Sequence, residues 1–220
     1  MNLYITQNSY YFVHRHFINL FDKEKSKIIY VKESGRGITK KYIEIIQNFG
    51  LFNTLICSFL EILYFTLLIK RVLKLETFNI NDINLNAYLD DEIKSRKYKN
   101  VISIGCPCMI DSDLQKKYQI SIINLHGGII PYQKGRFSPL KSIKNGHKYL
   151  GATLYYISNS FDEGSLISQD YFLIKNTRII SNYNKVLNLS ANLLKKFFQN
   201  EIKTIPTNVL ESFHRENKHK

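Results

Sequence analysis

The sequence predicts an α/β fold with one mixed, mostly parallel sheet and helices on both of its faces. Short continuous apolar runs, typical of strands covered on both faces, alternate with longer segments of helical spacing. The chain carries no evident repeat and no linker rich in Pro, Gly or Ser. We therefore expect a core over residues 1–175, with 176–220 packed on the same domain as a C-terminal helix and tail.

Each element follows from a local pattern of apolar residues and chain breakers. Apolar runs predict strands at Leu3–Ile5, Ile28–Val31, Val101–Ile104, Ile120–Asn124, Thr153–Ile157 and Tyr171–Ile174. Helical spacing predicts helices over Tyr10–Phe21, from about Thr39, and over Leu187–Phe198. Between Gly37 and Asp90 the pattern indicates helices and nothing more specific.

Composition excludes several classes of protein. The 220 residues are 44% hydrophobic and 22% charged, a balance that argues against disorder. Three cysteines are too few for a disulfide scaffold and suit a reducing compartment. The start Met1-Asn2-Leu3-Tyr4 lacks the basic and apolar regions of a secretory signal, so a cytoplasmic (bacterial) location is expected.

The chain is strongly basic, with 31 Lys and Arg against 18 acids and a net charge of +13. A compositional bias, phosphate-bearing ligands, nucleic acid and an anionic membrane surface all fit this charge. The basic residues are spread along the chain and do not form one dense run. Charge alone therefore does not choose among these partners.

One apolar segment, Leu51 to Ile69, approaches the length of a membrane span, since fourteen of its nineteen residues are apolar. Glu61 lies at its middle, where an acid is costly in lipid, and Lys70 and Arg71 follow. A buried or partner-facing helix is favoured over membrane-surface contact or a span. We expect no stable membrane span, and a homodimer interface would explain the segment.

Familiar cofactor and metal motifs are absent from the sequence. It contains no G-x-G-x-x-G, no P-loop, no H-E-x-x-H and no pair of C-x-x-C motifs. Cys106 and Cys108 flank Pro107, but zinc would need further ligands from elsewhere. We expect no metal site.

A polar cluster closes the strand that ends at Asn124. Residues two apart on a strand share a face, so Asn124 and His126 project together at a carboxyl end, where α/β sheets bind ligands. Gly127 and Gly128 let the backbone approach a ligand closely. Asp162 follows the strand Thr153–Ile157 and is expected above the same edge. Amide, imidazole and carboxylate suit acyl transfer, although a structural Asn and a surface His also fit the pattern.

The order Asn124-Leu125-His126, Pro131, Gly135 and Asp162-x-Gly164 resembles the folate-dependent formyltransferases. The resemblance is strong over Val101 to Gln169 and faint for Gly37 to Asp90. It implies a Rossmann-like domain, 10-formyltetrahydrofolate as formyl donor and a primary amine as acceptor. It also implies that Asn124, His126 and Asp162 occupy the catalytic positions.

The same resemblance implies binding residues for the two substrates. The pterin would lie against the loop after the strand Val101–Ile104, and Phe161 would close its other side; these cofactor residues are Cys106, Pro107, Cys108, Met109, Ile110 and Phe161. Asn8 and Ser9, at a helix N-terminus, are candidates for phosphate binding together with Gly127, Gly128, Lys134 and Arg136. Lys134 stands where the family commonly has Arg.

The Asn-Leu-His-x-Gly form looks most like the sugar N-formyltransferases. The expected acceptor is therefore a nucleotide-linked amino sugar, with dTDP-4-amino-4,6-dideoxyglucose as best guess, for surface polysaccharide (O-antigen) synthesis. Glycinamide ribonucleotide and methionyl-tRNA formyltransferases are the enzymatic alternatives. The non-enzymatic alternatives are a basic nucleic-acid-binding module and a non-catalytic subunit. We expect no nucleic-acid partner.

Overall fold

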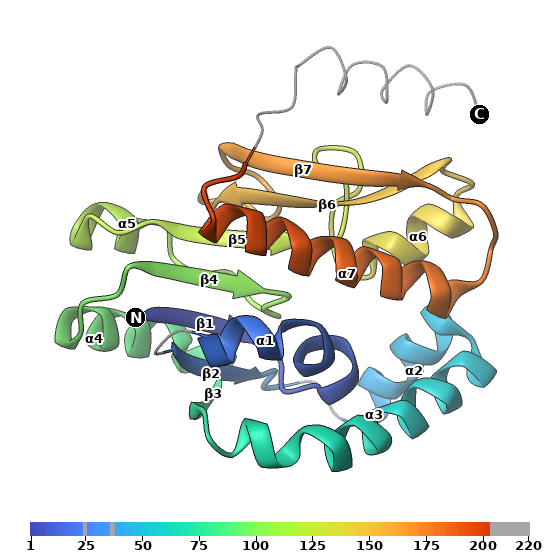
Figure 1. Cartoon of the computed structure of the whole chain (residues 1–220), viewed down its shortest axis with the longest axis horizontal. Coiled ribbons are helices and arrows are strands. Elements are labelled where there is room, and N and C mark those ends of the chain that lie inside the picture. The colour runs from blue at the N-terminus through green and yellow to red at the C-terminus, as the bar shows by residue number, and fades with distance from the viewer. Residues whose placement is uncertain (24–25, 36–37, 203–220) are drawn as a thin grey trace.

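A computed structural model describes residues 1–23, 26–35 and 38–202 (Figure 1). Its centre is a seven-stranded sheet of order β3-β2-β1-β4-β5-β6-β7. The strands are β1 (Asn2–Thr6), β2 (Ser26–Lys32), β3 (Glu76–Asn81), β4 (Asn100–Ile104), β5 (Ile122–His126), β6 (Tyr149–Tyr156) and β7 (Leu166–Leu173). Neighbours from β3 to β5 are parallel, whereas β6 is antiparallel to both β5 and β7. The mixed, mostly parallel α/β fold is confirmed.

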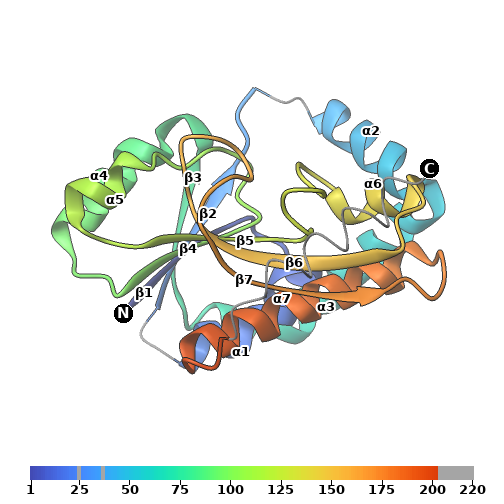
Figure 2. The same cartoon turned by 90° about the horizontal axis from the view of Figure 1, so that it is seen from above.

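Helices cover both faces of this sheet, as Figure 2 shows from above. Strand residues alternate between two cores: Tyr4 packs with one, and Leu3 and Ile5 pack with the other. The first core faces α1 (Arg15–Lys23) and α7 (Ile179–Phe198). The second faces α4 (Leu85–Ser95) and α5 (Asp113–Tyr118).

Several elements differ from the sequence prediction. The stretch from Gly37 to Asp90 holds α2 (Ile38–Phe49), α3 (Leu51–Val72) and the short η2 (Asp82–Asn84) as well as β3. Strand β3 was not predicted, because this edge strand is mostly exposed and lacks an apolar run. The first helix begins with a π-helical turn, η1 (Tyr10–His14), α6 (Ser138–Lys144) is additional, and α7 begins at Ile179 instead of Leu187. The C-terminal segment 176–220 lies partly outside the described residues.

Helix α3 packs one face on the domain through Glu61. The Glu61 carboxylate accepts hydrogen bonds from the Tyr10 and Tyr11 amides at 2.5 and 2.9 Å, and from the Ser9 hydroxyl at 2.9 Å. It therefore satisfies free amides at the start of η1, where an acid is favourable. By length and hydropathy alone α3 could cross a membrane, but its only acid is used inside the domain.

His14 lies in the core beside α1 with no exposed surface. Its Nε2 atom is 2.9 Å from the Tyr30 hydroxyl, and rings of Tyr10, Phe21 and Tyr30 surround it. Burial lowers the pKa of His14 from 6.5 to about 4, because the charged imidazole would lose its hydration. His14 is therefore neutral in the folded chain near pH 7.

We expect this histidine to make folding stability depend on pH. Between about pH 6.5 and 4 the unfolded chain binds a proton that folded His14 does not, so the free energy of unfolding falls with falling pH. The loss approaches about 3 kcal/mol once the pH is below about 4. Urea unfolding at pH 7 and at pH 4.5 measures it. His14→Phe should reduce the pH difference, and an unchanged difference would contradict this account.

Candidate active site

Asn124 and His126 lie at the carboxyl end of β5, on the sheet face that α4 and α5 cover farther back. In β5, Ile122 packs into the core of that face and Ile123 into the opposite core, so Asn124 and His126 share the side of Ile122. Both side chains are only partly buried. The expected projection of these two residues on one face is therefore what the structure shows.

Tyr155 joins Asn124 to Asp162. It lies directly opposite Asn124 in the antiparallel β5–β6 pair. The Asn124 Nδ2 atom donates to the Tyr155 hydroxyl at 2.5 Å, and that hydroxyl donates to Asp162 Oδ1 at 3.1 Å. Burial, followed by the nearby Asp162 carboxylate, raises the pKa of Tyr155, so it remains a hydroxyl donor. Sequence reasoning missed Tyr155, and the available signal was its position in the strand next to Asn124.

Asp162 reaches the site by a different route from the one expected. Because β6 runs antiparallel to β5, its end at Tyr156 lies opposite Ile123, away from the carboxyl edge. Asp162 nevertheless lies beside His126 at that edge, as expected, although strand β6 does not end there. The β6–β7 connection lies on the α4 and α5 side of the sheet (Figure 2), and it places Asp162 Oδ1 3.2 Å from His126 Nδ1.

Two backbone features hold the Asp162 loop in place. The amide of Gly135 donates to Asp162 Oδ2 at 2.5 Å, which ties this loop to the one after β5. Gly164 has a φ of 145°, and a Cβ there would lie 1.8 Å from the Tyr156 carbonyl oxygen. Only glycine fits that position without moving the loop.

Both ring nitrogens of His126 face hydrogen-bond acceptors. Nδ1 faces the Asp162 carboxylate, and Nε2 lies 2.7 Å from the Gln133 carbonyl oxygen. The Ser138 hydroxyl, 3.2 Å from Nε2, donates to the Gly127 carbonyl at 2.8 Å. Whichever ring nitrogen carries a hydrogen therefore has an acceptor within reach.

Gly127 and Gly128 make this packing possible. A Cβ on Gly128 would lie 2.3 Å from the Gln133 carbonyl oxygen and 2.8 Å from His126 Nε2. A Cβ on Gly127 would come within 3.3 Å of Val186. The glycine pair therefore lets the loop after β5 fold close to His126.

The predicted folate loop follows β4, the neighbour of β5. Cys106, Pro107 and Cys108 are partly buried and Met109 is exposed, whereas Ile110 belongs to the core. Phe161, on the Asp162 loop, exposes its ring. The Cys106 and Cys108 sulfurs are 3.7 Å apart, and their hydrogen bond raises the pKa of Cys106 and lowers that of Cys108.

The predicted phosphate-binding side chains already have partners. Lys134 Nζ is 2.8 Å from Glu163, and Arg136 contacts Glu33 and, at 3.9 Å, Glu44. The Ser9 hydroxyl and the amides after it bind Glu61, and Asn8 is exposed. An anion bound at Ser9 would therefore have to displace the Glu61 carboxylate.

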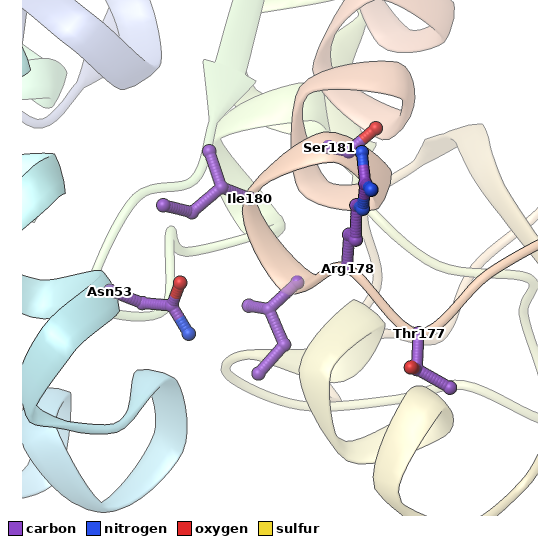
Figure 3. A pocket seen from close by; sticks show the side chains of 6 residues that line it. Asn53, Thr177, Arg178, Ile180 and Ser181 are labelled. Carbon is purple, nitrogen blue, oxygen red and sulfur yellow. The ribbon is translucent and has the colours of Figure 1, made fainter.

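A separate pocket of about 480 Å³ opens between α3 and the start of α7 (Figure 3). Asn53 reaches toward it from α3, and the segment from Thr177 to Ser181 forms the other wall. Asn124, His126 and Asp162 do not line this pocket. Within the described ranges, no group of three or more His, Cys, Asp or Glu side chains could hold a metal ion.

Replacement of Tyr155 tests the arrangement of this site. Tyr155→Phe removes the hydroxyl that Asn124 and Asp162 share, so both side chains lose a fixed partner. We expect kcat of the reaction at this site to fall roughly tenfold with little change in KM, since a lost hydrogen bond of this kind costs about 1–3 kcal/mol. Steady-state kinetics measure this loss. Tyr156→Phe, on the neighbouring exposed side chain, is the matched control, and equal kcat values for both variants would contradict the role given to Tyr155.

The fold is that of an α/β domain, and Asn124, His126 and Asp162 lie together at one edge of its sheet. The model of the formyl transferase family matches residues 70–196, more than half of the chain. The chain therefore belongs to the formyl transferase family, a family of formyl-transferring enzymes, and the predicted family is confirmed.

Individual relatives are distant. The methionyl-tRNA formyltransferase of Hydrogenobaculum sp. is 26% identical over 142 residues, covering 61% of this chain and 46% of that protein. The chain spans less than half the length of the curated relatives first matched.

Solved structures show the same fold. Phosphoribosylglycinamide formyltransferase from Anaplasma phagocytophilum aligns with a TM-score of 0.57 and 17% identity, covering 94% of this chain and 90% of that one. A 4-N formyltransferase from Francisella tularensis aligns with a TM-score of 0.57 and 16% identity, covering 93% and 72%. At these identities the likeness extends to the fold alone.

Proposed function

We propose that this chain transfers a formyl group from 10-formyltetrahydrofolate to the amine of a nucleotide-linked amino sugar. The observation that carries the proposal is the chain of contacts from Asn124 through Tyr155 to Asp162 and His126. It combines an amide donor, an imidazole and a carboxylate within hydrogen-bond distance, as acyl transfer requires.

The proposed chemistry begins with attack of a neutral amine on the formyl carbon. The new C–N bond forms first, giving a tetrahedral oxyanion, and the bond from the formyl carbon to N10 of the folate then breaks. The Asn124 amide has two hydrogens and gives one to Tyr155, so the other can be donated to the oxyanion. His126, with its hydrogen on Nδ1 beside Asp162, takes the proton lost by the amine at Nε2, which must first leave the Gln133 carbonyl, and passes it to the departing folate nitrogen.

Asp162 holds His126 in position for this work. Its Oδ1 atom faces both His126 and Tyr155, while the Gly135 amide fixes Oδ2. The carboxylate therefore fixes the orientation of the His126 ring. His126→Ala or Asp162→Asn removes this coupling.

The folate would lie beside the loop after β4. Cys106, Pro107, Cys108 and Met109 offer partly exposed surface and backbone groups there, and exposed Phe161 can close over a flat ring. Buried Ile110 would support the loop from beneath. No metal takes part in this proposal.

The proposed acceptor side comprises Asn8, Ser9, Gly127, Gly128, Lys134 and Arg136. Support for an amino sugar comes from the Asn-Leu-His-Gly-Gly sequence at the end of β5 and from a sugar N-formyltransferase of Shewanella sp. among the similar folds. For dTDP-4-amino-4,6-dideoxyglucose, pyrophosphate binding requires Lys134 and Arg136 to exchange their carboxylate partners for phosphate. The product would serve surface polysaccharide synthesis in the bacterial cytoplasm.

Acceptor binding distinguishes the candidates. Calorimetric titration of the full chain, saturated with a non-reactive folate analogue, would compare dTDP-, UDP- and GDP-linked amino sugars with glycinamide ribonucleotide and methionyl-tRNA. We expect a dTDP-linked amino sugar to bind most tightly, and Arg136→Gln to weaken it at least tenfold. Tighter binding of glycinamide ribonucleotide or of methionyl-tRNA would show that the acceptor is not an amino sugar. The proposal of formyl transfer itself would not be affected by that result.

A further inference from the structure

The outward face of α3 is a continuous apolar surface. Its most exposed side chains follow helical spacing: Phe52 is 74% exposed, Phe59 66% and Ile62 67%. Leu51, Leu55, Leu63, Phe65 and Leu67 extend the surface along α3. We call these eight exposed α3 side chains the α3 face. A contiguous apolar area of this size marks an interaction surface.

The spacing within the α3 face is that of a helix that packs on another helix. Phe52, Leu55, Phe59, Ile62 and Thr66 are separated by three and four residues alternately. This 3-4 repeat forms the seam of two helices packed side by side. From Phe52 to Thr66 this seam is about 21 Å long, within a helix of about 33 Å.

Charge on α3 distinguishes a protein partner from a lipid surface. Helices that lie on membranes carry many Lys and Arg residues beside their apolar face. From Leu51 to Ile69 the only charged residue is Glu61, and it is bound inside the domain by Ser9 and the amides of η1. From Leu51 to Ile69, α3 therefore has an apolar outer side and no Lys or Arg beside it. This pattern favours burial against another helix over contact with a membrane surface.

We propose that two copies of this chain form a dimer by packing their α3 faces antiparallel about a twofold axis. If each of the eight side chains contributes roughly 100 Å², the two copies bury on the order of 1,600 Å² in total, which a specific stable interface needs. A twofold axis uses the same surface in both copies, and such dimers are the commonest assemblies. Phe59 and Ile62, near the middle of the repeat, then lie close to the axis and meet their counterparts.

Sedimentation equilibrium of the full chain from 1 to 100 μM tests the proposal. We expect a mass near twice 25.9 kDa for the wild type and near 25.9 kDa for Phe59→Glu. Ile83→Glu, which places the same charge on the 80% exposed Ile83 of η2, is the matched control and should remain a dimer. A monomeric wild type, or a dimeric Phe59→Glu, overturns the proposal.

A second measurement decides the matter if Phe59→Glu does not fold, as judged by circular dichroism. Ile62→Cys treated with a short bis-maleimide should give a covalent dimer at dilute protein, whereas Ile83→Cys should not. If Ile62→Cys gives no more covalent dimer than Ile83→Cys, the proposal is overturned. A monomer that sediments with phosphatidylglycerol vesicles also overturns it, in favour of a membrane surface. The formyl acceptor does not enter these measurements, so dimerisation and the proposed function can fail independently.

Discussion

Asn124→Ala and His126→Ala should each lower kcat/KM for formyl transfer by on the order of 100- to 1,000-fold, because loss of one oxyanion donor typically costs this much. In the proposed mechanism Asn124 offers its second amide hydrogen to the developing charge, and His126 is held between Asp162 and the Gln133 carbonyl. Neither side chain belongs to the apolar core, so the folded state should persist. Steady-state rates and circular dichroism of both variants measure the two effects.

The control for these variants is His16→Ala. His16 contacts Asn188 from α1, on the opposite side of the sheet, and should leave turnover within about twofold of wild type. The double variant Asn124→Ala/His126→Ala should lose less than the product of the single losses, since the two side chains serve one charge. Near-full turnover in both single variants would refute their assignment to the reaction.

The largest effect on stability is expected at Lys27. The Lys27 Nζ atom lies 2.6 Å from Glu92 Oε2, and each side chain is only 8% exposed. The Tyr88 hydroxyl donates to Glu92 at 2.9 Å, and the Tyr98 hydroxyl donates to its other oxygen. Burial alone would raise the pKa of Glu92. The hydrogen bonds from Lys27 and the two tyrosines lower that pKa by more than burial raises it, so the net pKa is below its usual value.

Lys27→Met leaves the buried Glu92 carboxylate with only the longer contact to half-exposed Arg96, at 3.5 Å, and should lower the free energy of unfolding by about 3–5 kcal/mol. Urea unfolding measures this change. Lys196→Met is the matched control: its exposed pair with Asp170, at 3.8 Å, is expected to contribute less than about 1 kcal/mol. Lys27→Met/Glu92→Leu should recover much of the loss. If Lys27→Met and Lys196→Met cost the same, the buried pair has no special role.

The sequence predicted those parts of the fold that depend on local patterns. Apolar runs identified β1, β2 and β4, and the two-residue period of a strand placed Asn124 and His126 on one face. It did not predict β3, whose residues Glu76–Asn81 lie at an exposed edge and need no apolar run. Local pattern therefore sufficed where a strand is buried on both sides.

Features that depend on strand direction and long-range packing could not be predicted. Because β6 is antiparallel to β5, Tyr155 lies opposite Asn124. The connection after β6 then crosses the face of the sheet, and this brings Asp162 to Tyr155. The Gln133 carbonyl at His126 is a backbone contact that no residue type signals. In the sequence, Glu61 is only an acid within the apolar run of α3. Its hydrogen-bond partners are backbone amides about fifty residues earlier in the chain, which no local pattern indicates.

The most direct test of the central claim is turnover by the purified full chain. The protein would be incubated with 10-formyltetrahydrofolate and a dTDP-linked amino sugar, and the products followed by mass spectrometry beside His126→Ala. We predict that the sugar gains one formyl group, that tetrahydrofolate appears in equal amount, and that the variant forms little of either. Release of formate without any formylated amine, or equal product from His126→Ala, would contradict the account.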